Sequence, residues 1–254
     1  MKKNILITGA SSGIGEACAR RYAANGDNLI LFARNKAKLQ EMKEELSAKH
    51  GIKVHTDAFD IRARERVKEA INNIPFELKE IDVLINNAGL VIGLDREFEG
   101  CLDEWDVVTD TNIKSLLAMT RLIVPAMKAQ GRGHIVNIGS VAGDAAYYGG
   151  SVYCATKSAV KALSDALRIE LVDTPLRVTN IKPGLVETNF SVTRFRGDSE
   201  KADKVYEGIR PLIGEDVAET IFWTTSLPQH IQIAEMLVLP TNQASGTIVH
   251  REKK

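Results

Sequence analysis

A tyrosine and a lysine stand four residues apart at Tyr153 and Lys157. On a helix this spacing places the phenol and the ammonium on one face, one turn apart. A free tyrosine has a pKa near ~10, which is too high for acid–base work at neutral pH, and a neighbouring ammonium lowers it by favouring the phenolate. The pair therefore indicates proton transfer at a carbonyl or alcohol oxygen. Because this spacing is common on helices, its meaning depends on the motifs around it.

A glycine-rich stretch at residues 8–15 has the composition of a phosphate-binding turn. It reads TGASSGIG and follows an apolar run. Glycine lets the backbone turn tightly and approach a pyrophosphate, which the positive end of the next helix stabilises. The order G-x-x-x-G-x-G meets the usual dinucleotide fingerprint only in part, so a turn without a ligand is the alternative. The residues predicted to hold a dinucleotide here are Gly9, Ser11, Ser12, Gly13, Ile14 and Gly15.

Arg34 follows the second apolar run, at the point where a cofactor with a free ribose 2′-hydroxyl usually meets an acidic residue. A guanidinium there suits a 2′-phosphate, and Lys38 could add charge. This favours NADP(H) over NAD(H). The alternative is a solvated arginine in front of a helix that Asn35 caps.

Other polar residues at the ends of apolar runs are candidates for ligand contacts. Ser140 follows the run 135–138 and could donate to a substrate oxygen, although a turn-capping serine is the alternative. The sequence Asn-Asn-Ala-Gly at 86–89 follows another run. Asn112 lies in the helical segment 108–122, where an amide is a mediocre helix former. Each of them, taken alone, fits a structural explanation as well as a functional one.

Composition limits the kinds of partner. The 254 residues carry a formal net charge of zero, so we expect neither nucleic acid nor an anionic membrane as a partner. Three cysteines stand far apart without a C-x-x-C pair, which excludes a readable zinc motif, and no metal is expected. The first apolar run is too short for a secretion signal, and no run is long enough to span a bilayer. We therefore expect a cytoplasmic protein.

The elements that must position these residues alternate along the chain. Short, continuously apolar runs are typical of parallel strands covered on both faces, and the amphipathic segments between them indicate helices. Strands are expected at residues 5–7, 29–32, 53–58, 83–85, 134–138, 177–181 and 236–239. Helices are expected at residues 16–25, 37–50, 62–74 and 157–171. The alternation predicts an α/β fold with one doubly wound domain over residues 1–254.

Two polar stretches, at residues 90–106 and 187–214, interrupt the alternation. Neither has the pattern of a core element. Both follow the carboxyl end of a predicted strand, where ligands bind in this architecture. Loops of this length are usually lids, binding loops or disordered segments, and the second is expected to be a substrate loop.

Together these motifs resemble the short-chain dehydrogenase/reductase family over essentially the whole chain. The resemblance rests on residues 8–15, Asp60-Ile61, residues 86–89, Asn112, Ser140, the Y-x-x-x-K motif at 153–157, and Pro183-Gly184 with Thr188 beyond. It implies a single Rossmann-like domain with a seven-stranded parallel sheet and helices on both faces. It also implies a homo-oligomer, a tetramer rather than a dimer.

The resemblance also assigns catalytic roles. Tyr153 would be the general acid in reduction and the general base in oxidation. Lys157 would lower the pKa of Tyr153 and bind the nicotinamide ribose. Ser140 would hold the substrate oxygen, and Asn112 would help to hold a water that links Lys157 to solvent. The hydride transfer itself belongs to the cofactor.

The same resemblance assigns cofactor contacts after each strand. Asp60 and Ile61 would contact the adenine, and Asn87 the adenine ribose region. The other cofactor contacts expected are Ala88, Gly89, Pro183, Gly184, Val186 and Thr188.

The C-terminal third resembles one branch of the family, the NADP-dependent 3-hydroxy acid (serine) dehydrogenases. The resemblance lies in residues 184–191, 194–197 and 239–245. It implies a small anionic substrate: serine, 3-hydroxyisobutyrate or 3-hydroxypropionate, or the matching semialdehydes. Related enzymes of that branch reduce sulfoacetaldehyde to isethionate.

Two arginines support an anionic substrate without choosing one. Arg194 and Arg196 lie on the expected substrate loop, and either guanidinium could bind a carboxylate or a sulfonate. Solvated charges on a mobile loop are the alternative. Tyr147 and Tyr148 could line the pocket or simply pack the loop. A reductase of neutral ketones or sugars, and a non-catalytic dinucleotide-binding protein, stay open as other functions.

Overall fold

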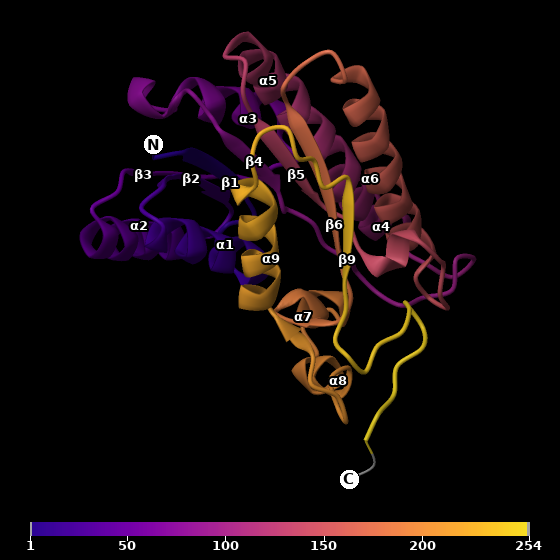
Figure 1. Ribbon diagram of the computed structural model, residues 1–254. Helices are drawn as coiled ribbons and strands as arrows, with labels where there is room; N and C mark the ends of the chain where they lie inside the picture. Colours follow the sequence, from indigo (N-terminus) through magenta and orange to yellow (C-terminus); the bar gives the residue numbers. More distant parts are fainter. Residues whose placement is uncertain (1, 253–254) are drawn as a thin grey trace.

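Seven parallel strands form one sheet in the centre of the computed structural model, which describes residues 2–252 (Figure 1). The order across the sheet is β3-β2-β1-β4-β5-β6-β9. The strands are β1 (Asn4–Thr8), β2 (Asn28–Ala33), β3 (Val54–Ala58), β4 (Val83–Asn86), β5 (His134–Ile138), β6 (Arg177–Pro183) and β9 (Glu235–Val238). All seven predicted strands are present, with ends that differ from the prediction by at most two residues. The predicted doubly wound α/β fold is thereby confirmed.

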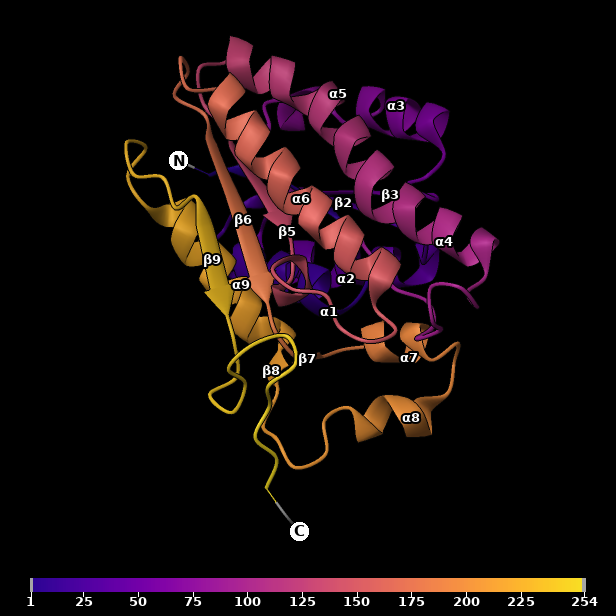
Figure 2. The same ribbon diagram turned by 90° about the vertical axis from the view of Figure 1, so that its right-hand side faces the viewer.

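Helices cover both faces of the sheet (Figure 2). One face packs against α1 (Gly13–Ala24), α2 (Lys36–His50) and α9 (Gly214–Ser226). The other face packs against α3 (Arg64–Asn72), α5 (Ser115–Ala129) and α6 (Ser151–Glu170). Successive side chains of a strand point to opposite faces.

The central strand β1 shows how this arrangement makes two cores. Ile5 and Ile7 lie in one apolar core, and Leu6 between them lies in the other. All three side chains are fully buried. Burying a side chain of this size stabilises the fold by roughly 1.5–3 kcal/mol, which explains why the three central residues of the strand are apolar.

The helical segment predicted at 108–122 is not one regular helix. It comprises the end of α4 (Leu102–Thr109), a π-helical turn (Asp110–Lys114) and the start of α5. A π turn inserts one residue into the helical ladder and frequently lies at a functional site. Here it contains Asn112, whose side-chain amide bonds to Leu90 in the loop after β4.

The stretch 187–214 contains short elements that its polar composition did not predict. These are α7 (Phe190–Arg194), α8 (Ser199–Lys204) and β8 (Leu212–Ile213), which pairs in parallel with β7 (Val186–Glu187). Ser191 and Ala202 are buried. Two 3₁₀ turns, Phe76–Leu78 and Val141–Gly143, complete the described elements.

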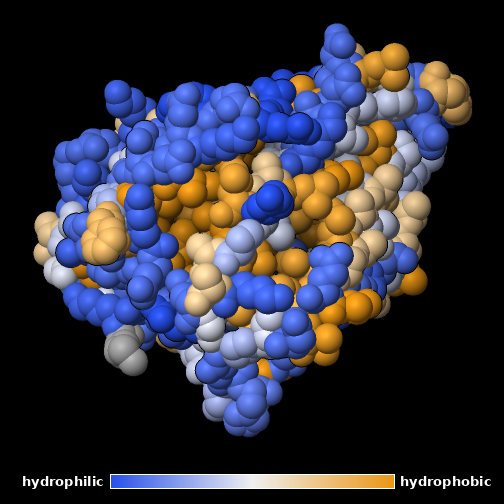
Figure 3. Space-filling model, turned by 90° about the horizontal axis from the view of Figure 1, so that it is seen from above, coloured by the Kyte–Doolittle hydropathy of each residue, from blue (hydrophilic) through white to orange (hydrophobic). Residues whose placement is uncertain are grey.

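Figure 3 shows the end of the molecule that faces away from α7 and α8. Hydrophobic residues gather in the middle of this face, between bands of hydrophilic ones. No helix within residues 2–252 has both the length and the apolar character needed to cross a membrane.

Candidate active site

A cavity of about 740 Å³ lies at the carboxyl ends of the sheet strands. Motifs that are far apart in the sequence line it together. The predicted site residues on its wall are Gly9, Ser11, Ser12, Gly13, Ile14, Arg34, Asp60, Ile61, Asn87, Ala88, Gly89, Ser140, Tyr147, Tyr148, Tyr153, Lys157, Pro183, Gly184, Val186, Thr188 and Arg194. Four predicted residues lie outside this wall: Gly15, Lys38, Asn112 and Arg196.

The glycine-rich turn joins β1 to α1 and presents its backbone to the cavity. Gly9 and Gly13 have φ angles of 66° and 53°, a conformation that side chains disfavour. A Cβ on Gly15 would lie 2.3 Å from the Gly9 carbonyl oxygen, so Gly15 permits the close packing of the turn rather than touching the cavity. Ser12 precedes α1 and makes no side-chain cap bond, which leaves the first amides of the helix for an anion. The turn therefore fits a pyrophosphate.

Asn87 supports this turn from the neighbouring strand. Its side-chain nitrogen donates to the carbonyls of Thr8, at 3.0 Å, and Gly9, at 3.2 Å. The Thr8 hydroxyl in turn accepts from the Asn87 and Ala88 amides. The Asn-Asn-Ala-Gly motif thus positions the glycine-rich turn, in addition to lining the cavity.

A cluster of charged residues surrounds the part of the cavity next to β2 and β3. Arg34 lines it and makes no hydrogen bond or ion pair with its side chain among the described residues. Lys38, which the sequence suggested as a second cation here, is instead bound to Glu41 at 2.9 Å and Glu16 at 3.4 Å. Glu41 lies on α2 together with Lys38, and Glu16 lies on the neighbouring helix α1, so the Lys38 ammonium is paired outside the cavity wall.

Arg62 lines the cavity where Lys38 does not, and sequence reasoning missed it. Its guanidinium pairs with Asp60, with 2.6 Å between Nη2 and Oδ2. This hydrogen bond holds the pKa of the Asp60 carboxyl below its usual range. The available signal was an arginine two residues after Asp60, which follows a predicted strand.

Tyr153 and Lys157 occupy the first two turns of α6, and both are buried. Burial raises the pKa of Tyr153, and the Ser140 hydroxyl and the Arg194 guanidinium oppose that rise. Lys157 is not among the groups that shift the pKa of Tyr153 here, and its Nζ donates to the Ile138 carbonyl at 2.7 Å. The lowering by Lys157 that the family resemblance implies stays a prediction. Burial also lowers the pKa of Lys157, to about 8. Both groups are thus biased toward their neutral forms.

Ser140 and Asn112 hold the chain around this pair. The Ser140 hydroxyl accepts from the Ala142 amide at 3.1 Å and so caps the 3₁₀ turn, while its residue lines the cavity. The Asn112 amide donates to the Leu90 carbonyl and to the Thr156 hydroxyl of α6. Asn112 therefore connects the loop after β4 to the helix of Tyr153, from behind the cavity wall.

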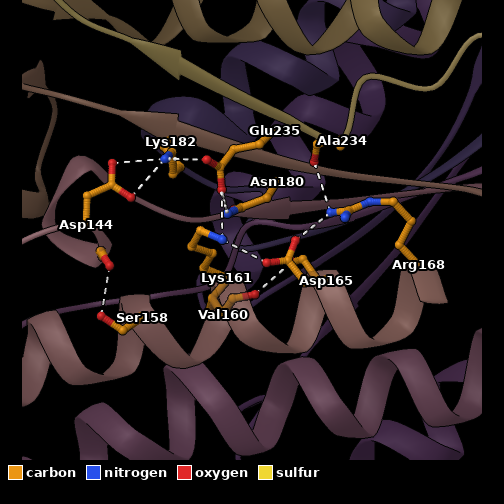
Figure 4. A network of polar contacts seen from close by, with 12 residues as sticks. Asp144, Ser158, Val160, Lys161, Asp165, Arg168, Asn180, Lys182, Ala234 and Glu235 are labelled. Carbon is orange, nitrogen blue, oxygen red and sulfur yellow. Dashed lines mark hydrogen bonds and ion pairs between the residues drawn. The ribbon is translucent and has the colours of Figure 1, made fainter. Parts of the chain in front are cut away.

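A charged network fixes the other side of the Ser140 turn (Figure 4). The Lys182 ammonium, on β6, bonds to both carboxylate oxygens of Asp144 at 2.9 Å and to Glu235 of β9 at 2.6 Å. Its side chain is only 7% exposed. Asp144 directly follows the turn that Ser140 caps, so the network ties the turn to the sheet edge.

The two predicted loop arginines differ in their surroundings. Arg194 lines the cavity, and its Cζ lies 5.6 Å from the centre of the Tyr153 ring. Its Nη2 contacts the Tyr147 hydroxyl at 3.3 Å, but its Nε is buried without a hydrogen-bond partner. Arg196 instead binds Asp95 and Glu104 outside the cavity.

Tyr147 and Tyr148 both line the cavity, in different ways. Tyr147 is largely buried, and burial raises its pKa to about 12. Tyr148 is 76% exposed, and its hydroxyl accepts from the Arg96 guanidinium at 2.8 Å. Tyr147 therefore belongs to the wall beside Arg194, and Tyr148 to the rim. Among residues 2–252, no group of three or more His, Cys, Asp or Glu could hold a metal ion.

Comparison with known proteins agrees with this arrangement. The family model described as short chain dehydrogenase matches residues 3–198. An NADP-dependent 3-hydroxy acid dehydrogenase of Salmonella typhi is 44% identical over 97% of this chain and 99% of the relative. Sulfoacetaldehyde reductase 2 of Chromohalobacter salexigens is 41% identical over 96% of each chain.

A solved structure, the closed form of serine dehydrogenase complexed with NADP⁺, superposes with a TM-score of 0.92. It is 41% identical in sequence, and the match covers 98% of this chain and 99% of that one. The sheet order, the cavity and these matches lead to one conclusion: the chain belongs to the short-chain dehydrogenase/reductase family of oxidoreductases.

Proposed function

We propose that this chain is an NADP(H)-dependent oxidoreductase that interconverts a small anionic hydroxy compound and its aldehyde or semialdehyde. Substrates of this class are 3-hydroxy acids such as serine and 3-hydroxypropionate, malonic semialdehyde, and sulfoacetaldehyde, whose reduction gives isethionate. The observation that carries the proposal is the buried, unpartnered Nε of Arg194 beside Tyr153. A carboxylate or sulfonate would satisfy this donor, and leaving it unpaired is costly.

The choice of NADP(H) is supported by the charges beside β2 and by the relatives. Arg34 lines the cavity without a competing carboxylate partner, and Arg62 stands nearby on the same wall. A guanidinium is a suitable partner for a 2′-phosphate. The 3-hydroxy acid dehydrogenase of Salmonella typhi is named as NADP-dependent, and the serine dehydrogenase structure contains NADP⁺.

The residues around Tyr153 would divide the work of the reaction. When bound, NADP(H) supplies or accepts the hydride. Tyr153 would give its Oη proton to the new alcohol in reduction and take it back in oxidation. Ser140 would orient the substrate oxygen toward that hydroxyl.

The remaining residues would hold the two ligands in position. Lys157, adjacent on α6, would bind the cofactor ribose, and Asn112 would hold its helix in place. Arg194 would fix the far, anionic end of the substrate, which leaves the reacting carbon near Tyr153.

An initial-rate panel with purified protein tests the proposal. NADPH and NADH are each paired with malonic semialdehyde, sulfoacetaldehyde and neutral ketones, and NADP⁺ with serine and 3-hydroxypropionate. We expect the highest kcat/KM with NADPH and an anion. If a neutral ketone, diketone or sugar is preferred, the proposed anionic substrate class is wrong. If NADPH binds without turnover of any substrate, the protein is a non-catalytic dinucleotide-binding protein.

We also propose that the chain forms a homo-oligomer, as the family resemblance implies, with a tetramer expected before a dimer. Exposed apolar side chains on α9 and on the edge strand β9, Trp223 and Leu237, support an interface there. Light scattering during gel filtration gives the assembly mass. A cytoplasmic location is part of the same proposal, and cell fractionation tests it.

A further inference from the structure

Arg196 joins two loops that are distant in the sequence. From the segment after α7, its Nε donates to Glu104 Oε1 at 2.8 Å and its Nη2 to Glu104 Oε2 at 2.7 Å. The same Nη2 also donates to Asp95. Asp95 lies in the loop after β4, and Glu104 lies in the first turn of α4. The fork-to-fork pairing with Glu104 is the geometry that gives guanidinium–carboxylate pairs their directionality.

A backbone contact lies directly beside this ion-pair cluster. The Gly93 amide donates to the Arg194 carbonyl at 2.8 Å, so the same loop holds the chain on both sides of Phe195. Gly93 has a φ angle of 74°, and a Cβ there would lie 2.7 Å from the Arg196 Nη2. Figure 2 shows α7 next to the loop that leads into α4.

The backbone of Arg196 is itself unusual. Its φ angle of 54° is the only positive value outside glycine among residues 2–252. Such a conformation is disfavoured for a side chain of this size and persists where surrounding contacts hold it. The next residue, Gly197, continues the left-handed turn with a φ of 94°. The tight bend puts the guanidinium of Arg196 on the facing loop, while the guanidinium of Arg194 stays at the cavity.

The charges of the cluster are matched to one another. The Glu104 hydrogen bonds raise the pKa of Arg196, and Arg196 in turn holds the pKa of Glu104 below its usual range. The side chains are 47% and 25% exposed, so dissolved salt can weaken the pair. A partly exposed ion pair such as Arg196–Glu104 can favour one position of the 187–214 segment and still break reversibly.

We propose that Arg196 is a positioning residue for substrate affinity. Its ion pairs with Asp95 and Glu104 hold the segment that contains α7, residues 187–214, in a closed position and so keep Arg194 on the cavity wall. This inference rests on the proposed anion-binding function of Arg194. It gives Arg196 a function that differs from the direct substrate contact expected from the sequence. Release of the pair would let the segment open, and the anion would lose its oriented guanidinium.

The test compares Arg196→Gln with Glu104→Gln, which breaks the same pair from the other side. Arg210→Gln is the matched control, because Arg210 is an exposed arginine of the same segment with no side-chain hydrogen bond among the described residues. Substrates are 3-hydroxypropionate and its neutral amide, 3-hydroxypropanamide, with NADP⁺. Both pair-breaking variants should raise KM for the acid roughly five- to tenfold, with little change in kcat or in any rate measured with the amide.

Two readouts do not depend on substrate. In the Trp223→Phe background, Trp105 is the only tryptophan and lies next to Glu104; its fluorescence should become more accessible to acrylamide when the pair is broken. Thermolysin should also cut the 187–214 segment several-fold faster. The charge-reversed double variant Arg196→Glu/Glu104→Arg should restore protection at least in part. Unchanged quenching and proteolysis in both single variants would overturn the proposal.

A double variant separates this proposal from the anion-binding function. If Arg196 acts through Arg194, then Arg194→Gln/Arg196→Gln should have no higher KM for the acid than Arg194→Gln alone. Additive effects, or equal effects on acid and amide, would overturn the positioning function of Arg196. If Arg194→Gln alone leaves KM for the acid unchanged, the anion-binding function fails, whereas the quenching and proteolysis results still decide whether the pair closes the segment.

Discussion

The Lys157 ammonium donates to the main-chain carbonyl of Ile138 at 2.7 Å, and this bond ties α6 to the carboxyl end of β5. The group is buried, and burial is the cause of its lowered pKa, about 8 against an ordinary 10.5. A neutral amine can keep the same hydrogen bond. Lys157 is therefore held in place in either protonation state.

This lowered pKa predicts how stability depends on pH. Between about pH 8 and pH 10.5 the unfolded chain binds the Lys157 proton and the folded chain does not, so the free energy of unfolding rises with pH across this window. The difference corresponds to about 3 kcal/mol. Urea unfolding of the wild type and Lys157→Met should show the wild type gaining stability relative to the variant over this range. Parallel curves for the two proteins would contradict the shift.

Loss of the Tyr153 hydroxyl should remove the proton donor without disturbing the fold. Tyr153→Phe keeps the ring, which packs against Phe190 with 5.7 Å between ring centres. We expect kcat to fall roughly 10²- to 10⁴-fold, the usual contribution of general acid–base catalysis. Fluorescence titration with NADPH should give an unchanged Kd. A variant with near wild-type kcat would mean that another group moves the proton.

Cofactor preference should depend on Arg34 and Arg62 but not on Lys38. Arg34→Ser should lower kcat/KM with NADPH by roughly 10- to 100-fold, because a charged hydrogen bond to the 2′-phosphate is lost, and should change the NADH value little. Arg62→Ala should have a smaller effect in the same direction, since Asp60 already binds this guanidinium. Lys38→Ala is the control, because its ammonium pairs with Glu16 and Glu41. An equal loss of kcat/KM with NADPH in Lys38→Ala would contradict this and would indicate that the 2′-phosphate binds next to α2.

Gly15→Ala should disturb the glycine-rich turn at residues 8–15, because the new side chain would collide with its backbone. The added methyl group would lie 2.3 Å from the Gly9 carbonyl oxygen and 2.6 Å from the Asn87 side-chain nitrogen. We expect roughly 1–3 kcal/mol lower stability together with weaker NADPH binding. Gly246→Ala is the control for stability alone, because its methyl group would meet only the Val141 carbonyl, at 3.8 Å, while the residue itself lines the cavity. Thermal unfolding of both variants and NADPH titration of Gly15→Ala measure the two effects.

The strands were predictable because the sheet is covered on both faces. The centre of a strand such as β1 is apolar on both faces, and this continuous apolar run is visible in the sequence. The π turn was not predictable, because residues 108–122 keep an apolar helical stripe through it. The turn contains Asn112, which bonds to Leu90, 22 residues away, and such a long-range contact leaves no local signal in the sequence.

The Tyr153–Lys157 pair could be found from its spacing, whereas the hydrogen-bond partner of Lys157 could not. Tyr153 and Lys157 share a helix, so four residues of separation were enough to bring them together. The carbonyl that accepts the hydrogen bond of Lys157 comes from Ile138, at the end of β5. Likewise, Arg194 and Arg196 look equivalent in the sequence. The bend at Arg196 places the side chain of Arg194 on the cavity wall and that of Arg196 on the facing loop.

The Gly93–Arg194 hydrogen bond has a consequence for protein engineering. Residues 90–106 and 187–214 contact one another and form one surface, although the chain separates them widely. A chimera that receives a foreign 187–214 segment alone would keep its sheet but lose the matching surface of its neighbour. Exchange of both segments as a single cassette is therefore the rational unit for redirecting this scaffold to new alcohols.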